Sequence, residues 1–206
     1  MMTLRARLVA PVAFCSLLML GTRPSAAQDP AEVERNFEAG RFQQVGDAFS
    51  PSAPPEVIFL AGQSFQKQGN AARAVEAYQA LAARPESDAW HFVGRSAVQL
   101  QEGDADGALA SAQRAVEING GLTEAQFQLG LVRSRRSEWA QAAEAFDRAS
   151  EINATYAYAH YYGGIAHYRA NRPDRMATHF EQFLRVAPEA PERPEVTQLM
   201  RTVRGR

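Results

Sequence analysis

The chain contains very little cysteine and lysine, and it lacks the short motifs of several enzyme classes. Cys15 is the only cysteine among 206 residues, so the chain can form no internal disulfide and its stability must come from packing. Lys67 is the only lysine, and 22 basic against 23 acidic side chains leave no positive excess to attract nucleic acid. The sequence has no glycine-rich phosphate loop and no H-E-x-x-H, C-x-x-C or G-x-S-x-G motif. We therefore expect no enzyme, no cofactor and no nucleic-acid partner.

Long apolar runs are also missing, apart from one near the N-terminus. Arg5 and Arg7 precede a mostly apolar run over residues 8–20, and small residues follow up to Ala27. This arrangement is typical of a secretory signal peptide that is cleaved after Ala27. A retained anchor is the alternative, but 13 residues are fewer than the roughly 20 that cross a bilayer.

Cleavage removes three arginines and no acidic residue, which leaves 19 basic and 23 acidic side chains. We expect a mature protein in the periplasm or outside the cell, without stable membrane insertion. Abundant arginine and alanine beside a single lysine are typical of a GC-rich bacterial genome.

The chain does contain a period of 34 residues. Three columns of mostly apolar residues recur at this spacing: Ala74, Ala108, Ala142 and Met176; Tyr78, Ala112, Phe146 and Phe180; Leu81, Ala115, Ala149 and Phe183. A fixed period of this size predicts stacked helical hairpins, each of which buries its apolar face only against its neighbours. Truncating Phe146 to alanine should then cost about 3 to 5 kcal/mol of stability.

These repeats resemble the tetratricopeptide repeat (TPR), whose pattern runs W-x2-L-G-x2-Y, then A-x3-F, then P. Two copies match best, at Leu129, Gly130, Ala142, Phe146 and Ala149, and at Gly164, Met176, Phe180, Phe183 and Pro188. In another copy Gly94 and Gly103 lie nine residues apart instead of seven, which indicates a two-residue insertion near Gln101 and Glu102.

The resemblance implies an all-α, right-handed superhelical solenoid of about five hairpins with a C-terminal capping helix. The expected segments are a signal peptide at 1–27, a degenerate hairpin at 28–54, repeats at 55–87, 88–122, 123–156 and 157–190, and the cap and tail at 191–206. In this family the first helix of each repeat lines the concave wall. Carried over, that wall consists of Phe59, Gln63, Gln66, Lys67, His91, Arg95, Phe127, Arg135, Tyr158, Tyr161, Tyr168 and Arg169.

This wall mixes aromatic rings with cationic and amide groups, a combination that suits an extended peptide bearing carboxylates. The resemblance and the expected signal peptide together imply an exported, non-catalytic adapter whose partner is another polypeptide. One alternative is an assembly component that binds through its convex face and through Arg201, Arg204 and Arg206. Another is a glycan-binding accessory that uses the tyrosine-rich run over residues 156–168.

Histidine is the remaining candidate for chemistry. His160, His167 and His179 cluster in the last full repeat. Because seven residues of helix separate His160 from His167, they lie roughly 10 Å apart along the axis, too far to share one zinc ion. The sequence therefore predicts no metal site.

Overall fold

The computed structural model describes residues 29–204, so the expected signal peptide lies outside the described residues. These residues form helices and no strand. The helices are α1 (Pro30–Glu38), α2 (Phe42–Asp47), α3 (Pro55–Lys67), α4 (Ala71–Ala82), α5 (Ala89–Glu102), α6 (Ala105–Ile118), α7 (Thr123–Arg135), α8 (Trp139–Ile152), α9 (Ala157–Arg169), α10 (Pro173–Val186) and α11 (Arg193–Arg204). None of them is both long and apolar enough to cross a lipid bilayer.

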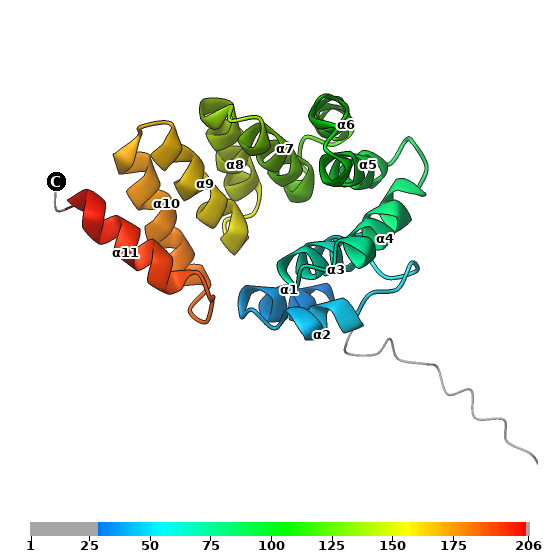
Figure 1. Ribbon diagram of the computed structural model, residues 1–206, viewed down its shortest axis with the longest axis horizontal. Helices are drawn as coiled ribbons and strands as arrows, with labels where there is room; N and C mark the ends of the chain where they lie inside the picture. Colours follow the sequence, from blue (N-terminus) through cyan, green and yellow to red (C-terminus); the bar gives the residue numbers. More distant parts are fainter. Residues whose placement is uncertain (1–28, 205–206) are drawn as a thin grey trace, which may run out of the picture.

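The helices pack as successive hairpins, α3 with α4, α5 with α6, α7 with α8 and α9 with α10, and each hairpin contacts the next. The short pair α1 and α2 precedes them, and α11 packs against α10. Figure 1 shows the hairpins following one another around an arc that brings α1 near the segment before α11. The all-α solenoid expected from the repeat period is confirmed.

The turns inside the hairpins keep the 34-residue period without a break. Each turn contains one residue with a positive φ angle: Gly69 (74°), Gly103 (83°), Ser137 (62°) and Asn171 (58°). The second helix always begins 16 residues after the first, as Ala89 and Ala105 illustrate for the hairpin of α5 and α6. The expected insertion near Gln101 and Glu102 is therefore wrong.

The nine-residue spacing between Gly94 and Gly103 arises because Gly94 does not occupy the position that Gly130 has in the next hairpin. Gly94 lies two positions before Ser96, and Ser96 is the residue in register with Gly130 in the next hairpin. A Cβ atom added at Gly94 would lie 2.5 Å from the carbonyl oxygen of Tyr78, so this glycine allows α5 to approach the backbone of α4. Gly94 thus serves the contact between two hairpins instead of the contact within one.

Within each hairpin, residue size is matched between the first and second helices. Added Cβ atoms would lie 2.4 Å from the Tyr78 ring at Gly62, 2.6 Å from the Phe146 ring at Gly130, and 2.4 Å from the Phe180 ring at Gly164. In the hairpin of α5 and α6, the corresponding residues are Ser96 and Ala112. There the serine side chain is buried and its hydroxyl donates to the carbonyl of Ala108 at 2.9 Å. A small residue on one helix accompanies a large one on the other because native packing tolerates neither overlap nor voids.

Contacts between the two ends of the solenoid join its first hairpin to its last. The Phe37 ring of α1 lies 4.9 Å from the Tyr158 ring of α9, measured between centroids. Arg41 pairs with Glu189 at 3.0 Å, and Gly40 lies against Pro191. The segment between α10 and α11 therefore packs against the turn between α1 and α2.

Candidate functional site

First helices of the hairpins line a concave cavity of about 560 Å³, which we call the groove. Its lining comes from α1, α3, α5, α7 and α9: Phe37, Gln63, Gln66, Lys67, Leu100, Gln101, Phe127, Leu131, Ser134, Arg135, Tyr158 and Tyr162. Six of these belong to the wall expected from the sequence, namely Gln63, Gln66, Lys67, Phe127, Arg135 and Tyr158.

The other expected wall residues lie elsewhere. Phe59 is 1% exposed and packs against the rings of Tyr78, Trp90 and Phe127, so it belongs to the core. Tyr161 is 8% exposed and donates to Glu195 at 3.4 Å. Tyr168 is exposed, and Arg169 lies over the Trp139 ring, 5.6 Å from its centroid.

His91 and Arg95 are expected on the wall only if the chain contains the supposed insertion. In the structure, Nδ1 of His91 hydrogen-bonds with the carbonyl of Arg84 at 2.9 Å, and Arg95 is exposed outside the groove lining. Without the insertion, the 34-residue step from Gln66 and Lys67 leads to Leu100 and Gln101, which do line the groove. The unbroken period was therefore the signal that could have found these two residues.

A carboxylate of the chain itself is bound at the cationic end of the groove. Nζ of Lys67 lies 2.7 Å from Oε1 of Glu192, and the hydroxyl of Tyr158 donates to both carboxylate oxygens at 3.2 and 3.1 Å. The Lys67 ammonium also lies 5.2 Å from the centroid of the Tyr158 ring and 5.9 Å from that of Phe42. Lys67, positioned over two rings, and the hydroxyl of Tyr158 thus hold a glutamate side chain that comes from the α10–α11 segment.

Two further polar groups of the groove have no partner among the described residues. Gln63 is 7% exposed, and its side-chain amide nitrogen makes no hydrogen bond. A buried donor without an acceptor is unfavourable by about 1 to 3 kcal/mol, so this amide favours a ligand that brings an oxygen. Arg135 is exposed and forms no ion pair within residues 29–204. The cation of Arg135 and the amide donor of Gln63 are therefore open to a ligand.

Acidic groups lie on the elements that frame the groove. Burial raises the pKa of Glu38 to about 7, and the neighbouring charge of Glu34 adds to this effect. Burial likewise raises the pKa of Glu124, in the first turn of α7, to about 7. Burial, followed by the charge of Glu192, raises the pKa of Tyr158 well above its usual range. Tyr158 is therefore a hydrogen-bond donor at any physiological pH.

The tyrosine-rich run does not form an exposed stacking surface. Tyr156, Tyr158 and Tyr161 are 5%, 2% and 8% exposed, and their rings pack into the core. Tyr162 stacks on Phe146 with centroids 5.9 Å apart. Among the tyrosines of residues 29–204, Tyr168 alone is exposed. A glycan would find one accessible ring here, not a row of them.

Potential metal ligands do not converge in the groove. Among the described residues, the cluster of histidine and acidic side chains that could hold an ion consists of Asp147, His167 and His179, and none of these lines the groove. The groove lining instead consists of hydrogen-bond donors, the two cations Lys67 and Arg135, and aromatic rings.

Comparison with known proteins agrees with this architecture. Residues 59–122 match the family model described as tetratricopeptide repeat. The fold is a TPR solenoid. TTC0263, a thermophilic TPR protein in Thermus thermophilus, has a TM-score of 0.60 and 18% identity, and the match covers 86% of this chain and 98% of that chain. No curated protein matches the chain by sequence.

Two other solved TPR structures with a similar fold concern peptide binding. YrrB, described as a TPR protein with an unusual peptide-binding site, has a TM-score of 0.52 and 21% identity, and the match covers 82% of this chain and 84% of that chain. The first TPR of Spaghetti (RPAP3), described as bound to the HSP90 peptide SRMEEVD, has a TM-score of 0.53 and 16% identity, with 59% of this chain and 94% of that chain covered. These likenesses establish the fold of the chain.

Proposed function

We propose that this protein is an exported, non-catalytic TPR adapter that binds an acidic segment of another polypeptide in its groove, in the bacterial periplasm or outside the cell. The export part of the proposal rests on the basic and apolar N-terminal pattern of residues 1–27. The peptide part draws support from two TPR neighbours whose descriptions mention a peptide-binding site or a bound peptide.

The observation that carries the proposal is the carboxylate of Glu192 between Lys67 and Tyr158. Charge-assisted hydrogen bonds of this kind are stronger than neutral ones, and two donor groups, the Lys67 ammonium and the Tyr158 hydroxyl, converge on a single carboxylate. The side chain of Glu192 stands where a glutamate or aspartate of a partner would bind. Binding of a partner then requires Glu192 to leave Lys67, and Arg135 and Gln63 supply further contacts along the groove.

A library of short acidic, basic and neutral peptides, screened against the purified protein, tests this proposal. We expect selected peptides to be enriched in Glu and Asp. Glu192→Gln removes the competing charge and should raise the affinity of an acidic peptide about tenfold, since a tenfold change corresponds to about 1.4 kcal/mol. Lys67→Gln should abolish the acidic preference. Arg148→Gln is the matched control, because it removes one positive charge from an exposed i,i+3 pair outside the groove.

Two results would contradict the proposal. If acidic peptides bind equally to wild type and Lys67→Gln, the groove is not where they are recognised. Partner capture from envelope extract that survives Lys67→Gln and Arg135→Gln, but is lost on removal of residues 194–206, would favour the assembly alternative. That alternative would make the contact between Lys67 and Glu192 a brace between the two ends of the solenoid.

A further inference from the structure

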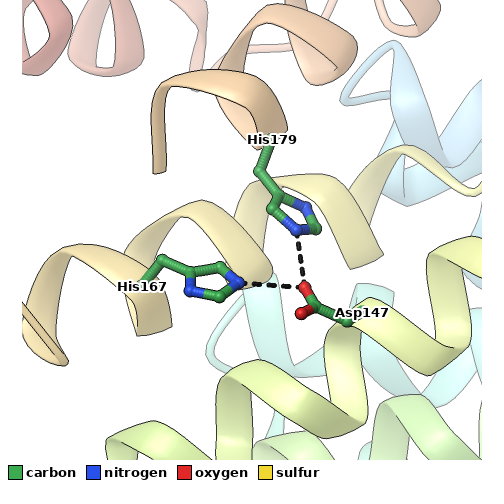
Figure 2. A group of neighbouring side chains, drawn as sticks. All are labelled: Asp147, His167 and His179. Carbon is green, nitrogen blue, oxygen red and sulfur yellow. Dashed lines mark hydrogen bonds and ion pairs between the residues drawn. The ribbon is translucent and has the colours of Figure 1, made fainter. Parts of the chain in front are cut away.

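Three potential metal ligands meet on the hairpins of α7 with α8 and α9 with α10. Asp147 belongs to α8, His167 to α9 and His179 to α10. Nε2 of His167 lies 2.9 Å from Oδ1 of Asp147, and Nε2 of His179 lies 2.7 Å from the same oxygen. Figure 2 shows both imidazole rings pointing at this single carboxylate oxygen from two different helices. The three ligand atoms all lie within 4.8 Å of one another.

The packing around the cluster fixes these orientations. The side chains of His167 and His179 are 1% and 9% exposed, and that of Asp147 is 16% exposed. Gly163 of α9 leaves room for the ring of His179, since a Cβ atom there would lie 2.8 Å from its Nδ1. With the ring held against α9, its Nε2 is directed at Asp147. Side chains held in this way are preorganised, which a binding site needs more than proximity alone.

The carboxylate of Asp147 is also held from its other side. Arg175 binds the second oxygen, Oδ2, at 2.9 Å. Oδ1 therefore remains directed at the two imidazoles, and Arg175 orients the carboxylate as outer partners do in metal sites.

We propose that Asp147, His167 and His179 form a site for a divalent transition-metal ion, with Zn²⁺ as the ion of choice. Two imidazole nitrogens and one carboxylate oxygen are a donor set that zinc takes in tetrahedral sites with an open fourth position. Ligands about 2.0 to 2.1 Å from a tetrahedral ion lie about 3.3 Å apart. To admit the ion, each imidazole nitrogen therefore moves about 0.5 Å away from Oδ1 of Asp147, and the two imidazole nitrogens, which lie within 4.8 Å of each other, approach to about 3.3 Å.

The fourth position would face a cleft of about 210 Å³ that shares no residue with the groove. Its lining includes Asp147, His179, Glu151 and His160. The rings of His160 and His179 lie 5.5 Å apart between centroids. Nδ1 of His160 is buried without a hydrogen-bond partner among the described residues. Water or a donor from a partner protein could complete the coordination from this cleft, while the ion would cross-link helices of two consecutive hairpins.

The test is metal binding by the untagged, metal-stripped protein. We expect Co²⁺ to give the intense visible absorption of a tetrahedral site, and Zn²⁺ to displace it. Zn²⁺ at about 100 times its dissociation constant should raise Tm by about 5 to 10 °C. His179→Gln and Asp147→Asn should each weaken Zn²⁺ binding at least about 100-fold, more than the loss of an outer partner costs. His91→Gln, which removes a histidine far from the cluster in sequence, should bind as wild type.

Two results would rule out this metal site. If wild type shows no tetrahedral Co²⁺ spectrum, the cluster only joins the helices by hydrogen bonds and binds no ion. This measurement uses wild type alone, so it is decisive even if a variant fails to fold. If His91→Gln weakens Zn²⁺ binding as much as His179→Gln does, the ion binds elsewhere. Far-UV circular dichroism in chelator separates loss of a ligand from loss of structure in the variants.

Discussion

The reciprocal sizes of Gly130 and Phe146 make a quantitative prediction about the core. Phe146 is 0% exposed and contacts Phe127 and Tyr162, so Phe146→Ala should cost about 3 to 5 kcal/mol. Gly130→Ser places a Cβ atom 2.6 to 2.8 Å from three atoms of the Phe146 ring. Overpacking of this kind costs typically about 1 to 3 kcal/mol. Independent effects would therefore add to about 4 to 8 kcal/mol.

The double variant should not follow this sum, because it recreates the pairing of Ser96 with Ala112. Its serine side chain occupies part of the space left by the ring, and its hydroxyl can donate to the carbonyl of Ala142, as that of Ser96 does to Ala108. We expect the double variant to be about 1 to 3 kcal/mol more stable than the sum of the single effects.

Urea unfolding followed by circular dichroism measures this coupling. With a slope of about 2 kcal/mol per molar urea, Phe146→Ala alone should lower the midpoint by about 1.5 to 2.5 M. The control cycle uses Gly120→Ser in place of Gly130→Ser, because Gly120 is exposed and its added Cβ has nothing closer than 3.5 Å. There the effects should add. Equal coupling in both cycles, or none in either, would refute the size-matching argument.

Three other predictions concern single residues. Burial raises the pKa of Glu38 to about 7 in the fold, against 4.5 when it is exposed, so protonation favours the folded state. Wild type should therefore lose stability as pH rises from about 5 to about 8, and Glu38→Gln should reduce that loss in thermal melts but leave the part due to Glu124. Gly94→Ala should destabilise by at least about 3 kcal/mol in urea, because its Cβ would meet backbone atoms that cannot rotate away. Ser137→Gly should stabilise by about 1 kcal/mol, because serine is strained at φ 62° and glycine is not; an unchanged urea midpoint would contradict this.

The period in the sequence predicted much of the groove but misplaced part of it. Gln66, Lys67 and Arg135 line the groove as expected, because residues 34 apart occupy equivalent positions on successive hairpins. His91 and Arg95 were misplaced because Gly94 was matched to the wrong column. Phe59 was misplaced because its neighbours on three helices close over it, and a period cannot show that degree of burial.

The sequence by itself determined the all-α fold and the 34-residue repeat of its hairpins. These features depend on local preferences and on contacts between residues at a fixed separation, which a repeating pattern records directly. Only the tertiary structure decided which distant side chains meet. Lys67 and Glu192 are 125 residues apart, and Asp147 reaches His179 across 32 residues. The first contact depends on the curvature that small rotations between hairpins accumulate, and the second on how two consecutive hairpins pack together. No single repeat encodes either of these arrangements.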